Sequence, residues 1–262
     1  MPLMPGAEPF SHDGGRLGVL LCHGFTGTPQ SLRPWAEHLA AADLTVRLPR
    51  LPGHGTTWQE MNMTRWPDWY AEVERALLDL RERCDAVFVA GLSMGGSLAL
   101  RLTQQHPQAV TGLILVNPAV HTVDPARRLL PVLRHLIPSL PGVVAFDIKK
   151  PGVEEVAYTR TPLNAAYSLT QLWALIRRDL AAITAPLLVL HSPEDHIVAP
   201  SNTAFVLAGV SSTDVTDIEL VDSYHVATLD NDAPLIFAET LAFIRRLTPT
   251  LTMGGESGHR PG

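Results

Sequence analysis

The chain is expected to fold as an α/β protein in which helices cover both faces of a mostly parallel sheet. Short apolar runs alternate with helix-length amphipathic segments along most of its 262 residues, as in parallel sheets enclosed by crossover helices. A Gly-x-Ser-x-Gly motif, residues 91–95, lies where one apolar run meets one such segment. An irregular interval, 121–180, then interrupts the alternation, and its roughly 60 residues far exceed an ordinary crossover.

The first 105 residues predict three strands and three helices. Strands are expected at 17–22, 44–48 and 86–90, and helices at 28–42, 67–84 and 95–105. In the 67–84 segment, Tyr70, Val73, Ala76, Leu77 and Leu80 recur at helical spacing and form one apolar face. Each predicted strand is therefore followed by a helix that can cover the sheet.

The remainder predicts three more strands around the irregular interval. Strands are expected at 113–116, 187–190 and 217–221, helices at 201–208 and 233–246, and helix-like pieces at 127–137, 153–157 and 164–180. A long insertion beyond the carboxyl ends of strands is a natural lid over a pocket. The predicted organisation is a core of residues 1–120 and 181–247, a small helical lid at 121–180, and a tail at 248–262 that is disordered or left from cloning.

Composition excludes several classes of function. The formal charge of −6, with scattered Lys and Arg, argues against a nucleic-acid partner, which calls for a basic patch. Cys22 and Cys84 lie in apolar runs and are expected to be buried free thiols, although one disulfide stays possible. The first apolar run is too short and too late for a signal peptide, and no run reaches membrane-spanning length. We expect a soluble, cytoplasmic protein.

Ser93 is the predicted nucleophile. The bare motif also arises by chance in turns that need two glycines. Here, however, a strand of β-branched and small residues, a tight turn and a helix follow in the order that exposes a serine at the sheet edge. The context therefore favours a catalytic serine.

A serine hydroxyl needs a histidine base and a carboxylate to orient that base. With this kind of turn, the acid follows a later strand and the histidine follows the last one. Asp195 follows the 187–190 strand and is preferred over its neighbour Glu194. His225 follows the last predicted strand and is the expected base.

Two backbone amides are expected to stabilise the oxyanion. Met94 follows the nucleophile and supplies one N–H group; Phe25, in the loop after the first strand, supplies the other. His23 in the same loop is interpreted as shaping it, with a catalytic role as the weaker alternative.

Five segments together resemble the α/β-hydrolase-fold serine esterases, and within them bacterial carboxylesterases and monoacylglycerol lipases, over nearly the whole chain. They are His23-Gly24-Phe25-Thr26-Gly27, Leu51-Pro52-Gly53-His54-Gly55, Gly91-Leu92-Ser93-Met94-Gly95-Gly96, Asp195-His196-Ile197-Val198-Ala199-Pro200 and Ser223-Tyr224-His225-Val226. The resemblance implies the same triad and oxyanion hole, without a cofactor or metal.

The resemblance also implies roles for residues of the predicted lid. Segments 147–149 and 153–158 are similar to the lid of those enzymes. In the monoacylglycerol lipases an acidic lid residue contacts the glycerol hydroxyls, which makes Glu155 a candidate; a solvated helix face is the alternative. His54 is expected to support its loop, and His196 departs from the family pattern beside the acid.

The predicted reaction is hydrolysis of short- to medium-chain acyl esters, with a monoacylglycerol as the specific expectation. Phe25, Leu129, Leu130 and Trp173 are candidate lining residues of an apolar pocket, or ordinary lid packing. Two alternatives remain: hydrolysis of carbon–carbon or amide bonds with the same triad, and a low-turnover ligand-binding receptor. Sequence does not decide the oligomeric state.

Overall fold

The computed structural model describes residues 2–142 and 147–250 and is built on a seven-stranded sheet. The strands lie in the order β1-β3-β2-β4-β5-β8-β9, and only β1 runs antiparallel to its neighbour. Their bounds are β1 Phe10–His12, β2 Leu17–Cys22, β3 Thr45–Leu48, β4 Ala86–Leu92, β5 Gly112–Val116, β8 Leu187–His191 and β9 Val215–Glu219. The predicted mostly parallel sheet is confirmed.

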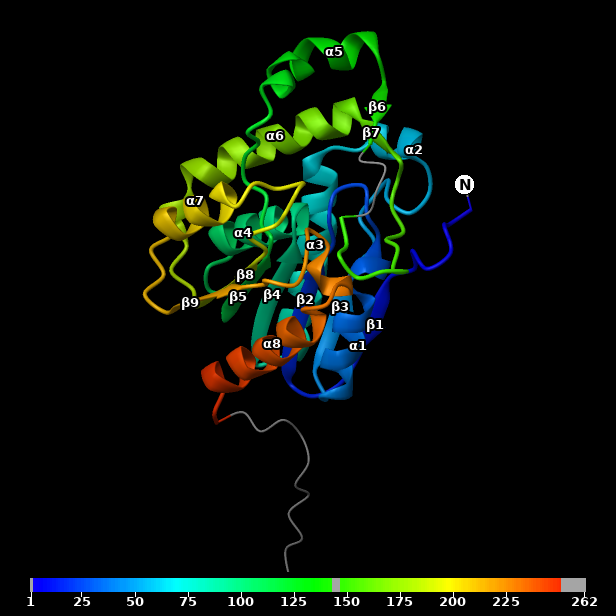
Figure 1. The fold of residues 1–262 in the computed structure, drawn as a ribbon. Coiled ribbons are helices and arrows are strands. Elements are labelled where there is room, and N and C mark those ends of the chain that lie inside the picture. The colour runs from blue at the N-terminus through cyan, green and yellow to red at the C-terminus, as the bar shows by residue number, and fades with distance from the viewer. Residues whose placement is uncertain (1, 143–146, 251–262) are drawn as a thin grey trace, which may run out of the picture.

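Helices cover both faces of this sheet, and a further group of elements lies beyond one end of it (Figure 1). The α-helices are α1 Arg33–Ala41, α2 Trp58–Met63, α3 Trp66–Arg83, α4 Met94–Gln105, α5 Leu130–Leu136, α6 Leu163–Arg178, α7 Ser201–Gly209 and α8 Ala233–Leu247. Short 3-10 turns are η1 Pro29–Leu32, η2 Pro125–Leu129, η3 Leu180–Ala182 and η4 Ala227–Leu229.

Two apolar layers form because successive strand residues point to opposite faces. In β4, Val87 and Val89 join the layer that also contains residues of α3, α4 and α6. Phe88 and Ala90 join the layer formed with α1 and α8. Every residue of β4 is buried, which explains why its sequence is a continuous apolar run rather than an alternating one.

Most strands and helices lie within two residues of their predicted positions. The last strand begins and ends two residues earlier than expected, at Val215–Glu219. The predicted 28–42 helix is divided into η1 and α1, and each piece carries a proline in its first turn. Proline fits a first turn because that position needs no backbone N–H donor.

The helix-like piece predicted at 153–157 is wrong: these residues, all of which the structure describes, contain no helix. Five residues are too few to repay helix nucleation. The segment instead pairs with a neighbouring loop: Val156 N–H donates to Gln30 Oε1 at 3.0 Å and Tyr158 N–H to Thr26 O at 3.1 Å. Its backbone is therefore stabilised by tertiary contacts.

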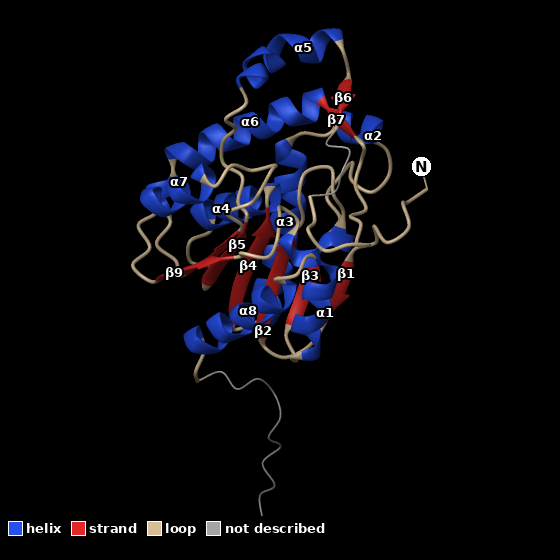
Figure 2. Cartoon of the chain, viewed as in Figure 1, coloured by secondary structure: helices blue, strands red, loops and turns tan. Residues whose placement is uncertain are grey.

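The 121–180 segment holds two unpredicted strands besides its helices (Figure 2). β6 Ser139–Pro141 and β7 Arg160–Pro162 form a separate antiparallel pair. α6 packs against the core through Leu172 and Ile176, both fully buried. By contrast, α5 exposes Val132 and Leu136 to solvent.

Cys22 and Cys84 are buried free thiols among the described residues, as expected. Within the same residues, no helix is both long and apolar enough to cross a membrane. The predicted tail continues from α8, and its residues 251–262 lie outside the described part of the chain.

Candidate active site

Ser93 lies on a strained turn between β4 and α4. Its φ of 58° and ψ of −118° fall in a region that residues with a side chain rarely adopt. The turn is held by surrounding hydrogen bonds: Ser93 N–H donates to Val116 O at 3.0 Å, and Ser93 O accepts from Ala119 N–H at 3.2 Å. Neighbouring β5 and the loop after it therefore fix the serine.

The two motif glycines are needed for close backbone approach. A Cβ atom on Gly95 would lie 1.8 Å from Cys22 O, and one on Gly91 would lie 2.3 Å from the carbonyl carbon of Gly95. Neither neighbour is a flexible side chain, so any larger residue would displace the main chain. The glycines thus permit the contact between β2, β4 and α4 that presents Ser93.

His225 and Asp195 meet through a direct hydrogen bond. Two loops carry them: the acid loop, residues 192–200 after β8, and the histidine loop, residues 220–232 after β9. His225 Nδ1 lies 2.7 Å from Asp195 Oδ2. Asp195 Oδ1 accepts the backbone N–H groups of Ile197 and Val198, whereas Glu194 is half exposed and reaches Lys149 Nζ at 3.3 Å.

The electrostatics of His225 suit a general base. Burial lowers its pKa, but the carboxylate of Asp195 and the acidic groups Glu155 and Asp147 more than offset that effect, so the pKa of His225 is raised. A neutral His225 is the form that can accept the serine proton. Activity that depends on it should therefore fall as the pH drops through this raised pKa.

Asn117 ties the acid loop and the histidine loop to the end of β5. Its Oδ1 accepts the backbone N–H of Ser192 at 2.8 Å, and its Nδ2 donates to His225 O at 2.8 Å. Asn117 has a φ of 43°, a conformation that asparagine tolerates better than most residues. Sequence reasoning passed over Asn117, although an asparagine after a buried strand and before a proline is a usable signal.

The loop carrying Phe25 is anchored by a buried, neutral histidine. His23 Nδ1 lies 3.0 Å from Gly24 O, and His23 Nε2 accepts the Leu51 N–H at 3.1 Å. Burial lowers the pKa of His23 to about 4, so the ring keeps its neutral form near neutral pH. These contacts fit the expected loop-shaping role, with the Gly24 position lying against Ser93.

Phe25, Ser93, Met94 and His225 line one cavity of about 440 Å³. Trp173 and Glu155 line it as well. Trp173 Nε1 donates to Ser97 Oγ at 3.2 Å, which fixes the indole above α4. The cavity lies between the carboxyl ends of the core strands and the 121–180 segment, and its volume is within the range typical of small-molecule sites.

Glu155 is a carboxyl group poorly placed to ionise. Withdrawal from water raises its pKa to about 7, although His225 acts in the opposite direction. A Cβ atom on Gly27 would lie 2.5 Å from Glu155 Oε1, so the absence of a side chain at Gly27 makes room for the carboxyl. Glu155 can therefore donate or accept a hydrogen bond at the cavity wall near neutral pH.

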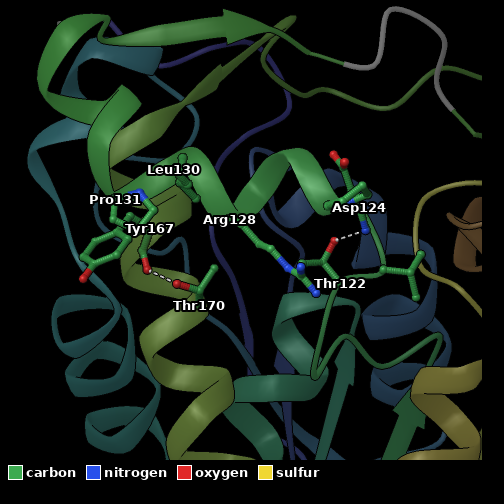
Figure 3. A pocket seen from close by; sticks show the side chains of 9 residues that line it. Thr122, Asp124, Arg128, Leu130, Pro131, Tyr167 and Thr170 are labelled. Atoms are coloured by element: carbon green, nitrogen blue, oxygen red, sulfur yellow. Dashed lines mark hydrogen bonds between the residues drawn. The ribbon is translucent and has the colours of Figure 1, made fainter.

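Leu129 and Leu130 do not line the cavity that holds Ser93, although Leu130 packs in a cluster with Ala166 and Phe25, which do. Leu130 lines an adjoining hollow of about 260 Å³ together with Arg128 and Tyr167 (Figure 3). It also packs against Leu163 and Ala166, while Leu129 is 59% exposed. Leu129 ends η2 and Leu130 begins α5. Leu130 therefore contributes to packing in this segment, whereas Leu129 lies on its surface.

Tyr158 also connects the 121–180 segment to the core, and sequence reasoning gave it no role. Its hydroxyl donates to Gly53 O at 2.8 Å and accepts the Thr56 N–H at 2.8 Å. His54, in the same loop, is fully buried and its Nδ1 lies 3.1 Å from Pro52 O. The loop at 51–56 thus supports the cavity wall, as expected for His54.

Comparison with known proteins gives one family across the chain. Residues 16–232 match the family described as serine aminopeptidase, S33. The chain is 43% identical to a thermostable monoacylglycerol lipase of Bacillus sp. (strain H-257), with 94% of this chain and 97% of the relative covered. It is 27% identical to a carboxylesterase of Bacillus subtilis (strain 168), over 92% of this chain and 97% of that protein.

Solved structures agree. A structure reported with LipS and LipT, two metagenome-derived lipolytic enzymes, superposes with a TM-score of 0.90 at 43% identity, covering 94% of this chain and all of that one. The fold, the matched range and these relatives carry one conclusion: the chain belongs to the α/β-hydrolase family that includes bacterial monoacylglycerol lipases and carboxylesterases, and it is a serine hydrolase.

Proposed function

We propose that this enzyme hydrolyses monoacylglycerols with short- to medium-chain acyl groups, through an acyl-enzyme on Ser93. The observation that carries the proposal is the hydrogen bond between His225 Nδ1 and Asp195 Oδ2 at 2.7 Å, which orients a histidine that lines the same cavity as Ser93. The 43% identical relative named a thermostable monoacylglycerol lipase supports the choice of substrate.

The reaction has two stages. His225 Nε2 takes the proton of Ser93 Oγ while that oxygen attacks the ester carbonyl carbon. The protonated His225 then gives its proton to the leaving alcohol, which leaves the acyl group on Ser93. Water, deprotonated by His225, attacks the acyl carbon, and Ser93 Oγ recovers the proton as the fatty acid departs.

The backbone N–H groups of Phe25 and Met94 are the proposed oxyanion donors. Met94 is the first residue of α4, so its N–H belongs to the positive end of a helix dipole. Both residues line the cavity beside Ser93. Donors of this kind contribute about 3 kcal/mol each to stabilising the transition state.

The two ends of the substrate are assigned from the chemistry of the cavity wall. Glu155, with a pKa near 7, offers a hydrogen-bonding group for the hydroxyls of the alcohol. Trp173, Leu169 and Phe25 provide apolar surface for the acyl chain. The 121–180 segment, inserted between the core parts 1–120 and 181–247, serves as a lid that encloses the alcohol and the acyl chain.

Amide hydrolysis is the second candidate, because the matched family is described as serine aminopeptidase. The same nucleophile and base serve both reactions. A substrate panel separates them: monoacylglycerols of increasing chain length, p-nitrophenyl esters and aminoacyl amides, compared by kcat/KM. The highest kcat/KM on medium-chain monoacylglycerols is expected, and higher turnover of an amide would overturn the ester assignment.

The nucleophile is tested with Ser93→Ala and a fluorophosphonate label. Because the serine oxygen forms the covalent bond, kcat should fall about 10⁶-fold and labelling should disappear, with an unchanged circular dichroism spectrum. Ser211→Ala is the matched control, because the Ser211 hydroxyl is exposed, donates to Ala181 O and does not line the cavity. Label retained by Ser93→Ala would show that another residue is the nucleophile.

A further inference from the structure

We propose that Asp147, in the 121–180 segment, is a positioning residue for the catalytic histidine, a role that rests on the proposed triad. Its carboxylate bridges the histidine loop and the acid loop. Asp147 Oδ2 accepts the backbone N–H of His225 at 3.1 Å. The same oxygen accepts the backbone N–H of His196 at 3.1 Å, and Oδ1 lies 2.7 Å from His196 Nδ1.

The backbone of His225 is thus held from two sides. Asn117 Nδ2 donates to its carbonyl from the core, while Asp147 accepts its N–H from the lid side. Both residues also reach the acid loop, at Ser192 and His196 respectively. Asp147 therefore mirrors Asn117 and sets the distance between the two loops that carry Asp195 and His225.

Hydrogen bonds of the backbone at residues 147–150 hold Asp147 in place. Its own carbonyl accepts the Val226 N–H at 3.0 Å. Farther along the chain, Lys149 N–H and Lys150 N–H donate to the carboxylate of Asp230, at 2.7 and 2.8 Å. Asp230 is 1% exposed and also accepts the Tyr224 N–H at 2.9 Å. Residues 147–150 are consequently fastened along the histidine loop.

The charge of Asp147 is well placed to act on His225. The Asp147 side chain is only 11% exposed, so solvent screens it weakly. Together with Asp195 and Glu155, it contributes to the raised pKa of His225. The His196 ring, on its other side, packs edge-on against Tyr224 with ring centroids 4.6 Å apart. Lys149 lies farther out, facing Glu194 and Asp222.

These contacts predict an effect on turnover rather than on substrate binding. Loss of the Asp147 carboxylate leaves the His225 N–H without its acceptor and frees the spacing of the two loops. A displacement of about 1 Å in a catalytic group can cost about 10²-fold in rate. Asp147 itself lines the cavity, but the apolar surface assigned to the acyl chain belongs to Trp173, Leu169 and Phe25, so KM should change less than kcat.

Three variants test the role. Asp147→Ala removes every carboxylate contact, whereas Asp147→Asn keeps an oxygen that can accept the His225 N–H but removes the charge. Asp222→Asn is the matched control, because Asp222 also lies on the histidine loop and is 61% exposed at its side chain, facing Lys149. Each is measured for kcat, KM, melting temperature and the pH profile of kcat/KM.

Asp147→Ala should lower kcat about 10²-fold, and Asp147→Asn should recover part of that loss. In Asp147→Asn the acid limb of kcat/KM should move to lower pH, because losing a negative charge lowers the pKa of His225. Asp222→Asn should match the wild type in both. Wild-type kcat and an unmoved acid limb in Asp147→Asn would overturn the proposal, even if Asp147→Ala failed to fold. Wrong assignment of the triad would appear separately, as fluorophosphonate labelling that survives Ser93→Ala.

Discussion

The sheet side and the 121–180 side of the cavity differ in how closely their backbone atoms are packed. On the sheet side, Ser93 lies where backbone atoms of β2, β4 and α4 approach too closely for any Cβ on Gly95 or Gly91. On the other side, α5 exposes Leu136 at 73% and packs through Leu130 in a cluster with Leu163, Ala166 and Phe25. Ser93 is therefore fixed by main-chain packing, while the opposite wall combines the buried helix α6, loop contacts such as Tyr158 N–H to Thr26 O, and the exposed surface of α5.

Because of this difference, the two regions should respond differently to substitution. Contacts between backbone atoms leave almost no acceptable substitutions at the turn carrying Ser93. Side-chain contacts such as those of Tyr158 and Glu155 can be altered one at a time. Substitutions on the sheet side should therefore abolish activity, and those on the 121–180 side should adjust it.

The largest effect is expected for Gly95→Ala. The added Cβ would meet Cys22 O at 1.8 Å, which forces α4 away from β2 and destroys the serine turn. Esterase activity and fluorophosphonate labelling should both be lost. Gly96→Ala is the control, since its nearest neighbour is Pro118 Cβ at 3.2 Å; equal loss in both variants would mean that helix α4 tolerates no added volume at all.

An intermediate effect is expected for Gly27→Ala. The new Cβ would lie 2.5 Å from Glu155 Oε1, and the flexible end of Glu155 can move away. Loss of one hydrogen bond to the alcohol, about 1.4 kcal/mol, should raise KM for a monoacylglycerol roughly tenfold. KM for a p-nitrophenyl ester should not change, since that substrate lacks the glycerol hydroxyls.

The double variant Gly27→Ala/Glu155→Ala tests whether Gly27 acts only through Glu155. If the glycine acts only by making room for the carboxyl, adding Gly27→Ala to Glu155→Ala should have no further effect on KM. Additive effects of the two substitutions would show that Gly27 supports the cavity by another route.

A smaller change is expected in the pH profile of Glu155→Gln. Glu155 contributes to the raised pKa of His225, so removing its charge should lower that pKa. The base His225 then stays neutral to lower pH, and the acid limb of kcat/KM should shift downward. A shift in the opposite direction would contradict the electrostatic coupling between these two groups.

The smallest effect is expected for Leu136→Ser on α5. Leu136 is 73% exposed, so its replacement should alter the free energy of unfolding by no more than about 0.5 kcal/mol. Turnover of a dissolved p-nitrophenyl ester should equal that of the wild type. A clear loss of stability would mean that α5 packs against a surface through this leucine.

Sequence reasoning predicted the sheet because strands buried on both faces, such as β4, are continuous apolar runs. It placed Ser93, Asp195 and His225 each after a predicted strand, and the structure brings Asp195 within 2.7 Å of His225, which lines one cavity with Ser93. Chain order narrowed the choice, because Asp195 and His225 each lie within a few residues of a predicted strand end. It failed at 153–157, where contacts with Gln30 and Thr26 replace helical hydrogen bonds. Such partners lie more than 100 residues away in sequence, and local pattern carries no trace of them. Asn117 did carry a local signal, an asparagine between a buried strand and a proline, but its partners belong to two later loops that this signal does not identify.

The two buried cysteines have a practical consequence. Burial raises the pKa of both Cys22 and Cys84, which suppresses the thiolate form that alkylating reagents attack. A single cysteine introduced by Leu136→Cys would thus react with a maleimide dye against a nearly silent background. The protein as it stands is suited to fluorescence measurements that follow α5 during turnover, without removal of any native side chain.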